Sequence, residues 1–281
     1  MSRNMFLLVS IWLLCLMPAA NAANIIWVDE GAGGFADWQV VLEEAGHTVT
    51  NMTGMNNLDQ GGIDAMNAAD LVVVSRDTNS GGYDDGEEPA QWNGLTVPII
   101  LTSSYLVRDS RWQWVPGGGT PSVSEADNLL IVENHPIFRG IGAAGDEIPV
   151  LAGSTNLTGV SDGGNGQVLA THPDGRLWIA YWEAGLVYNS ATSHIAGADR
   201  MWFAAAGNED SGTKGGMNLT EGGLAIFLNA IRFLTGGISP ELASAPSPEV
   251  ESADIPRDVV LAWTPGDYAA THDVYLGTSL E

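Results

Sequence analysis

The sequence is poor in cysteine and in basic residues, and both shortages limit what the protein can do. The single cysteine, Cys15, lies in an apolar N-terminal segment, so a chain without this segment has no disulfide, thiol nucleophile or cysteine metal ligand. Only 10 residues are basic and 34 are acidic, which gives a formal net charge of −24, and Lys214 is the only lysine. Nucleic-acid binding needs a basic face, so we expect no nucleic-acid partner.

Long apolar runs are also scarce. The run at residues 5–17 is shorter than the ~20 residues that a membrane span needs, and we expect no membrane span. Arg3 precedes this run and a small-x-small tripeptide follows it, which is the pattern of a signal peptide over residues 1–22. We therefore expect a secreted, extracellular or cell-surface protein, with a bacterial periplasm as the alternative compartment.

Residues 23–238 alternate between strand patterns and helical patterns. Continuous β-branched runs, such as residues 69–74, are typical of parallel strands that are covered on both faces. This order predicts an α/β domain with a three-layer, flavodoxin-like, mainly parallel sheet. The expected strands are 25–28, 47–52, 69–74, 97–102, 128–133, 147–151, 167–170, 177–182 and 201–206. The expected helices are 38–45, 59–68 and 224–234, the last with Thr220 as its N-cap.

The composition of the sequence changes after the last expected helix. Residues 239–256 are rich in proline, serine and acidic residues and are expected to form a linker. Residues 257–281 alternate like two β-strands and resemble the opening of a fibronectin type III-like domain, in which Trp263 would be the core tryptophan. Such a truncated all-β segment leads us to expect further domains beyond Glu281.

Three motifs carry a resemblance to a known superfamily. They are ENHPIFRGI at 133–141, DRMWFAAAGNED at 199–210 and GGLAIFLNAIRFLTGG at 222–237. Together with the order of elements, they resemble the class I glutamine-amidotransferase-like superfamily and, within it, the trehalose-utilisation (ThuA-like) branch. The resemblance implies a ligand crevice at the carboxyl ends of the strands, where doubly wound sheets also place their ligands on physical grounds.

The chain departs from this family at the catalytic positions. Amidotransferases have a cysteine after the fourth strand, where this sequence has Ser103 and Ser104, and a histidine after the last strand, where it has Asn208 followed by Glu209. We therefore expect no amidotransferase catalysis. Ser104 with His194 and an acid is an alternative nucleophilic arrangement, although the flanking residues are not G-x-S-x-G.

The acidic loop at 77–88 has the spacing of a calcium loop. Asp77, Asn79, Asp85 and Glu88 occupy the first, third, ninth and twelfth places. Glycine at the fifth place and a preceding strand favour an ordinary acidic loop instead. Calcium is the one cofactor that the sequence suggests.

Aromatic and polar residues that follow the first and fourth strands are candidates for a carbohydrate site, because flat rings with a few polar groups suit a sugar face. His135 precedes Pro136 at the end of a strand, and we interpret it as a structural residue, with a place near the crevice as the alternative. The ligand-binding candidates are Asp29, Glu30, Tyr105, Arg108, Trp112 and Trp114.

These observations lead to two functional hypotheses. The first is a secreted, non-catalytic, carbohydrate-associated or interaction module of a larger multi-domain extracellular protein. The alternative is a secreted sugar-processing hydrolase, because sugar cleavage needs two suitably spaced carboxyl groups. The residues of that alternative are Asp29, Glu30, Asp77 and Glu209, with His135 or His194.

Overall fold

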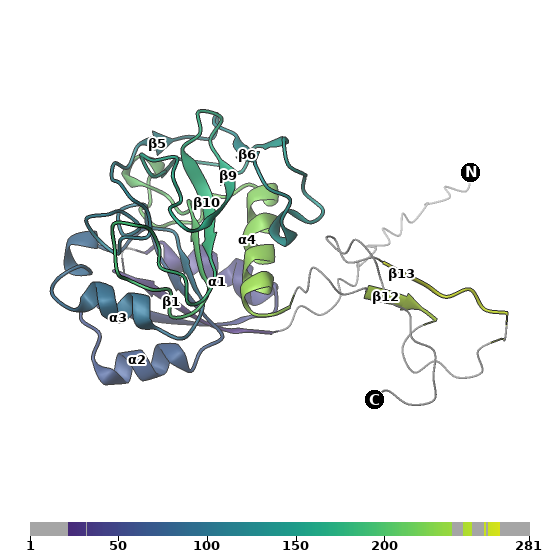
Figure 1. Ribbon diagram of the computed structural model, residues 1–281, viewed down its shortest axis with the longest axis horizontal. Coiled ribbons are helices and arrows are strands. Elements are labelled where there is room, and N and C mark those ends of the chain that lie inside the picture. The colour runs from purple at the N-terminus through teal and green to yellow at the C-terminus, as the bar shows by residue number, and fades with distance from the viewer. Residues whose placement is uncertain (1–21, 32, 238–243, 249–255, 257, 265–281) are drawn as a thin grey trace, which may run out of the picture.

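The computed structural model describes residues 22–31, 33–237, 244–248, 256 and 258–264. Its main unit is an α/β fold around a nine-stranded sheet with the order β2-β1-β3-β4-β11-β10-β9-β6-β7 (Figure 1). The strands of this sheet are β1 (Asn24–Asp29), β2 (Thr48–Thr53), β3 (Leu71–Val74), β4 (Ile99–Leu101), β6 (Leu129–Ile131), β7 (Glu147–Ile148), β9 (Gln167–Thr171), β10 (Leu177–Trp182) and β11 (Arg200–Phe203). The α-helices of the described residues are α1 (Phe35–Glu44), α2 (Gln60–Asn67), α3 (Glu88–Gly94) and α4 (Glu221–Leu234), and the short 3-10 helices are η1 (Ser80–Gly82), η2 (Pro136–Phe138) and η3 (Glu209–Ser211).

Five strands form a parallel half of the sheet. Strands β2, β1, β3, β4 and β11 pair in parallel in that spatial order, which is the doubly wound 2-1-3-4-5 order of flavodoxin-like sheets. All four residues of β3 are buried, as its continuous β-branched sequence predicts for a strand covered on both faces. The strand order reverses between β1 and β3, so a ligand crevice is expected at their carboxyl ends.

The other four strands pair antiparallel with their neighbours and extend the predicted parallel sheet at one side. β10 pairs antiparallel with both β11 and β9, and β6 extends the sheet to β7 in the same way. Residues 172–176 join β9 to β10 directly, and a connection this short permits a hairpin but no parallel crossover. The sheet is therefore mixed, with its parallel half at the first strands of the chain.

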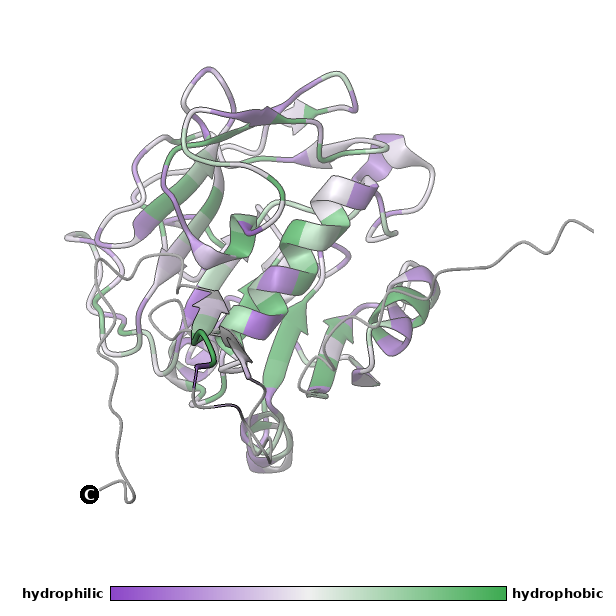
Figure 2. Ribbon diagram, turned by 90° about the vertical axis from the view of Figure 1, so that its right-hand side faces the viewer, coloured by the Kyte–Doolittle hydropathy of each residue, from purple (hydrophilic) through white to green (hydrophobic). Residues whose placement is uncertain are grey.

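Helices α1 and α4 cover one face of the sheet. Trp38 of α1 packs between Trp27 of β1 and Phe227 of α4, with ring centroids 5.0 Å apart in both pairs. Thr220 caps α4 by accepting a hydrogen bond from the Gly223 N–H, which agrees with the N-cap expected from the sequence. Figure 2 shows that apolar residues gather in the central strands and along α4.

An aromatic chain fills the other face beside α3. Trp92 of α3 stacks on Trp112 at 5.0 Å, and Trp114 stacks on Tyr188 at 5.4 Å. Both Trp112 and Trp114 are fully buried, which corrects the expectation that they form the wall of a sugar site. Burial of these large apolar rings stabilises the fold. The indole N–H of Trp112 donates to the Tyr83 carbonyl, and that of Trp114 donates to Oδ1 of Asn93.

Two further features differ from the sequence expectations. Helix α3 was not predicted, because the segment lies at the end of the acidic loop and is too short to show a periodic pattern. Strand β12 (Ser244–Ser247) falls inside the expected linker and pairs antiparallel with β13 (Ala262–Thr264).

The expected signal peptide up to residue 21 and the fibronectin-like residues 265–281 lie outside the described residues. Within the described part of the chain, no helix is long and apolar enough to cross a membrane.

Candidate functional site

The carboxyl ends of the parallel strands bring polar residues from distant parts of the chain to one edge of the sheet. Asp29 ends β1, residues 75–77 follow β3, residues 102–104 follow β4 and residues 204–209 follow β11. These segments share an edge because their strands run parallel. The sequence analysis placed its candidate crevice at this edge.

The loop at 207–217 packs against this edge at the point where the strand order reverses. The Gly215 carbonyl accepts a hydrogen bond of 3.0 Å from Nε1 of Trp38. A Cβ atom on Gly215 would lie 2.7 Å from Cβ of Asp77, and one on Gly34 would lie 2.5 Å from the Gly215 carbonyl carbon. The loop therefore lies over the carboxyl ends of β1 and β3, where a doubly wound sheet would otherwise receive a ligand.

Asp29 is buried beneath this region. Its carboxylate accepts hydrogen bonds from the Gly31 N–H at 2.9 Å and from Nδ2 of Asn51 at 3.1 Å. Burial raises its pKa, and the negative charge of nearby Asp77 acts in the same direction. Glu30 is exposed beside it. The Asp29 carboxylate is therefore held in place by these two hydrogen bonds under the loop.

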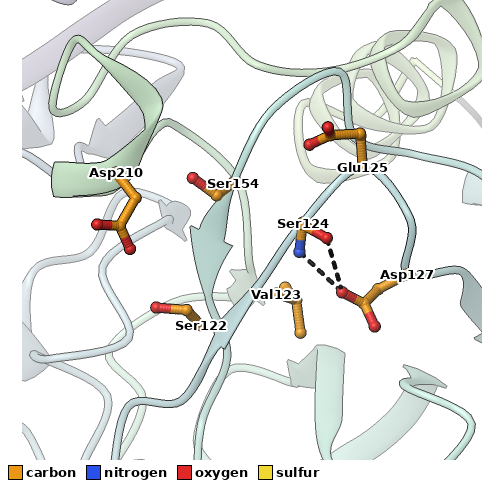
Figure 3. A pocket seen from close by; sticks show the side chains of 7 residues that line it. All are labelled: Ser122, Val123, Ser124, Glu125, Asp127, Ser154 and Asp210. Atoms are coloured by element: carbon orange, nitrogen blue, oxygen red, sulfur yellow. Dashed lines mark hydrogen bonds between the residues drawn. The ribbon is translucent and has the colours of Figure 1, made fainter.

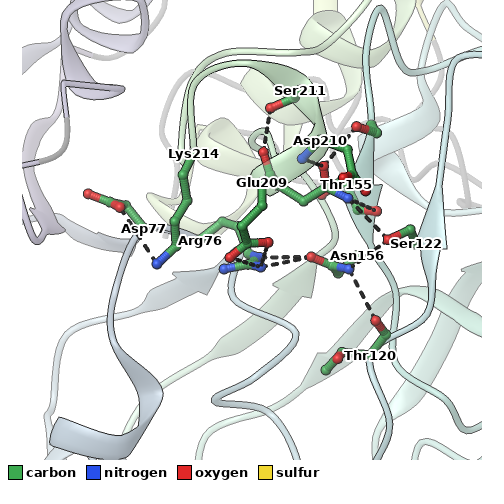
Figure 4. A network of polar contacts seen from close by, with 12 residues as sticks. Arg76, Asp77, Thr120, Ser122, Thr155, Asn156, Glu209, Asp210, Ser211 and Lys214 are labelled. Atoms are coloured by element: carbon green, nitrogen blue, oxygen red, sulfur yellow. Dashed lines mark hydrogen bonds and ion pairs between the residues drawn. The ribbon is translucent and has the colours of Figure 1, made fainter.

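Arg76 is the centre of a polar network at the same edge (Figure 4). Its side chain is only 2% exposed, and Nε and Nη2 both donate to Oδ1 of Asn156, at 3.1 and 2.8 Å. Nη2 also lies 2.9 Å from Oε2 of Glu209, and the guanidinium carbon lies 4.4 Å from the centre of the Tyr105 ring. Arg108 packs on the same ring at 5.2 Å. The network therefore joins segments that follow β3, β4 and β11.

Glu209 is the exposed member of this network. Its side chain is 64% exposed, whereas Arg76 is buried. Partial burial opposes ionisation of Glu209, but its own backbone N–H, the charge of Arg76 and the charge of Lys214 outweigh that effect and lower its pKa. Nζ of Lys214 also lies 3.9 Å from Oδ1 of Asp77. Arg76 and Lys214 therefore both lie beside carboxylates at this edge of the sheet.

Hydrogen bonds extend the network away from Arg76. Nδ2 of Asn156 donates to the Thr120 carbonyl at 3.1 Å and to Oγ of Ser122 at 3.2 Å. Ser122 also accepts from Nδ2 of Asn208, whose Oδ1 accepts a bond of 2.7 Å from Oγ of Ser154. The amides of these two asparagines are therefore held by both their oxygen and their nitrogen atoms.

An open pocket of about 360 Å³ adjoins this part of the network (Figure 3). Strand β5 (Ser122–Val123) pairs antiparallel with β8 (Thr155–Asn156), and both residues of β5 line the pocket. The Ser124 N–H and hydroxyl donate to Oδ2 of Asp127, and this backbone hydrogen bond lowers the pKa of Asp127 against the effect of its partial burial. Three serines, three carboxylates and one valine line the pocket: Ser122, Val123, Ser124, Glu125, Asp127, Ser154 and Asp210.

The structure does not bring Ser104 and His194 together. Ser103 and Ser104 follow the carboxyl end of β4 and are fully buried. His194 lies on the connection from β10 to β11, and the antiparallel pairing of Trp182 with Arg200 places that connection at the opposite end of the sheet. The suggested nucleophilic arrangement therefore does not form, because the reversed direction of β10 separates its members.

His135 lies between η2 and α4, in a structural position. Its Nδ1 accepts a hydrogen bond of 3.5 Å from the Ile137 N–H, and its ring meets the edge of Phe233 at 4.6 Å. Burial lowers its pKa to about 4. This placement agrees with the structural interpretation of the His-Pro turn, and His135 does not line the pocket.

The acidic loop does not gather its oxygen atoms around one point. Oδ1 of Asn79 accepts from the Gly81 N–H at 3.3 Å, and Oε2 of Glu88 accepts from the Asp85 N–H at 3.0 Å. In the described ranges, no group of three or more histidine, cysteine, aspartate or glutamate side chains is placed to hold a metal ion. The calcium interpretation is thus corrected, because the loop folds into η1 and α3 and uses these side chains to cap its own backbone.

Most of the residues that form the site were not predicted from the sequence. Arg76 directly follows a fully buried strand, and a cation in that position is a signal that could have identified it. Asn156 and Ser122 carry no such signal, because their role depends on a two-residue pairing between β5 and β8. Tyr105 and Glu209 were identified, and both contact Arg76.

Comparisons with known proteins found similarity among solved structures. No protein-family model matches the sequence, and no curated protein matches it. Among solved structures, the fold is similar to that of PurLQS from Thermotoga maritima, at 12% sequence identity and a TM-score of 0.41, over 76% of this chain and 99% of that chain. The α/β assignment itself follows from the order and direction of the strands.

Proposed function

We propose that the α/β domain is a non-catalytic module that binds carbohydrate, and that it belongs to a larger, secreted multi-domain protein with fibronectin-like modules. The ThuA-like resemblance of three sequence motifs is one support for this proposal. The observation that carries it is the open pocket whose serine hydroxyls and carboxylates adjoin a fixed hydrogen-bond network.

The chemistry of the pocket suits a polyhydroxy ligand. Serine hydroxyls both donate and accept hydrogen bonds, and carboxylates accept from ligand hydroxyls. Ser122 and Ser154 are already oriented by Asn208, so they lose little freedom when they bind a ligand. A pocket with three carboxylates disfavours phosphate or sulfate esters at these positions.

The same geometry gives little support to the hydrolase alternative. Sugar cleavage needs one carboxyl group that keeps its proton and a second that is ionised. Asp127 in the pocket has a lowered pKa, and Asp29, whose pKa is raised, does not line the pocket. The other carboxylates of that hypothesis, including Glu209, do not line the pocket either.

Binding to a panel of neutral and acidic oligosaccharides tests the proposal. A ligand that binds only the folded state raises the unfolding midpoint, and the stabilisation grows with the logarithm of the ligand concentration once this exceeds the dissociation constant. Ser154→Ala removes one pocket hydroxyl and is expected to weaken binding about threefold to tenfold, as the loss of a hydrogen bond of ~1 kcal/mol predicts. Glu44→Gln, an exposed change on α1 away from the pocket, is the control and is expected to leave the affinity unchanged.

Two outcomes would contradict the proposal. A flat response across the panel would remove the support for carbohydrate binding. Release of new reducing ends from an oligosaccharide, abolished by Asp210→Asn, would show a hydrolase in place of a binding module.

A further inference from the structure

We infer that Arg76 is the binding site for a carboxylate group of the ligand, and that Glu209 occupies this site in the free protein. The carboxylate site follows from the geometry around Arg76 alone. Its assignment to an acidic sugar, such as a hexuronate, rests on the proposed function.

Arg76 is already held in place for a carboxylate partner. Asn156 fixes Nε and Nη2 through one oxygen atom, and the Tyr105 ring lies against the guanidinium carbon at 4.4 Å. Because the guanidinium is already fixed, its remaining N–H groups can bind a carboxylate with little further loss of side-chain conformational entropy. The pair that it forms with Glu209 shows that a carboxylate fits, with Nη2 at 2.9 and 3.3 Å from the two carboxylate oxygens.

Glu209 is an occupant that can be displaced at low cost. It lies at the start of η3, and because its side chain is 64% exposed it stays largely hydrated while it is paired. A buried guanidinium without a counter-charge would be costly, but the exchange of one carboxylate for another never leaves Arg76 unpaired. The displaced Glu209 side chain would return to water, where its charge is well solvated.

The surroundings favour an anion at this point in a protein that is otherwise acidic. Lys214 stabilises the charge of Glu209, and it is the only lysine of the chain. Figure 4 shows Lys214 beside Arg76 on the side opposite Asn156. A ligand carboxylate at the position of Glu209 would therefore face two cations.

The carboxylate site and the pocket share structural elements. Asn156 bonds Arg76 through its oxygen and Ser122 of the pocket through its nitrogen. Asp210 of the pocket directly follows Glu209. A sugar acid that has its carboxylate at Arg76 could therefore place its hydroxyl groups toward the pocket.

Acetate binding to the full chain tests the carboxylate site without any sugar. The measurement is the unfolding midpoint against sodium acetate, with sodium chloride at equal ionic strength as the reference. We expect a rise in Glu209→Ala that follows single-site linkage, and an affinity about fivefold weaker in the wild type, where competition by Glu209 costs the ligand about 1 kcal/mol. Glu44→Gln removes the same charge at an exposed position on α1, away from both Arg76 and the pocket, and it should behave as the wild type.

Two results would overturn the inference. Equal acetate affinity in the wild type and Glu209→Ala would show that Glu209 does not compete for the site. An equal gain in Glu44→Gln would show that only the general charge matters. The double variant Glu209→Ala with Arg76→Lys keeps the positive charge but loses the fixed guanidinium fork, and retention of full acetate affinity there would equally exclude Arg76 as the binding group.

Glucose and glucuronate, titrated into the wild type, separate this inference from the proposed function. Tighter binding of glucuronate than of glucose, with the difference lost in Arg76→Lys, supports both. Equal binding of the two sugars contradicts the role of Arg76 and leaves the proposed function standing. Saturable acetate binding in Glu209→Ala without binding of either sugar supports the carboxylate site and contradicts its assignment to an acidic sugar.

Discussion

The pH dependence of stability should report the burial of His135. The imidazole is almost enclosed by Phe233 and Tyr181, and its Nδ1 accepts the Ile137 N–H. Burial lowers its pKa from an ordinary value of 6.5 to about 4. In the folded protein the ring therefore stays neutral at pH values at which the unfolded chain already binds a proton.

The sign and size of the effect follow from this difference. Stability is complete above pH 6.5, falls as the pH decreases from 6.5 toward 4, and is constant with respect to His135 below pH 4, because both states are then protonated. At roughly 1.4 kcal/mol per pKa unit, the contribution of His135 amounts to about 3 kcal/mol across this window.

Urea unfolding of the wild type and of His135→Asn between pH 3.5 and 7.5 measures this contribution. Asparagine can accept the same N-cap hydrogen bond but does not titrate, and subtracting its curve removes the titration of the carboxylates. The wild type should lose about 3 kcal/mol more than the variant between pH 7.5 and 4.

Ile137→Val is the matched control. It costs about 1 kcal/mol of packing at all pH values and should keep the slope of the wild type. A wild-type curve parallel to that of His135→Asn would refute the reasoning, because it would mean that the buried imidazole binds its proton as readily as in the unfolded chain.

Three further changes test the structural interpretation, each by chemical denaturation. Trp112→Ala should destabilise the fold by about 3–5 kcal/mol and leave sugar affinity unchanged, since the ring lies in the core; a loss of affinity without a loss of stability would return Trp112 to the binding site. Arg200→Met should cost about 3–5 kcal/mol, because the buried guanidinium donates to four backbone carbonyls that would lose their partners; a neutral effect would contradict this account. Thr220→Ala should cost about 1 kcal/mol through loss of the α4 cap, whereas Thr220→Ser should be nearly neutral; equal costs would show that the hydroxyl does not cap the helix.

Local patterns in the sequence predicted much of the fold. The apolar spacing from Leu224 to Leu234, with Thr220 before it, predicted α4, and continuous β-branched runs predicted β3 and β4. These predictions succeeded because burial on two faces or on one helical face leaves a regular signal in the residues themselves. Helix α3 escaped because its seven residues are too few to establish a period.

The candidate site was predictable only where strand ends carry the signal. Tyr105 and Glu209 follow parallel strands, and parallel strands bring their carboxyl ends together, so both were expected at one edge. Trp112 and Trp114 follow β4, as Tyr105 does, but both rings are buried in the core. Residue type alone could not distinguish a ring that binds sugar from a ring that fills the core.

The sequence by itself determined the α/β class, the place of most strands and the strongly acidic charge, because each depends on composition or on short-range pattern. Only the tertiary structure decided that the loop at 207–217 covers the strand ends and that Arg76 pairs with Glu209, which is 133 positions away. Such pairings depend on the order and direction of all the strands between them, and no local pattern encodes that arrangement. For the same reason, the reversed direction of β10, and not the residue types, separated His194 from Ser104.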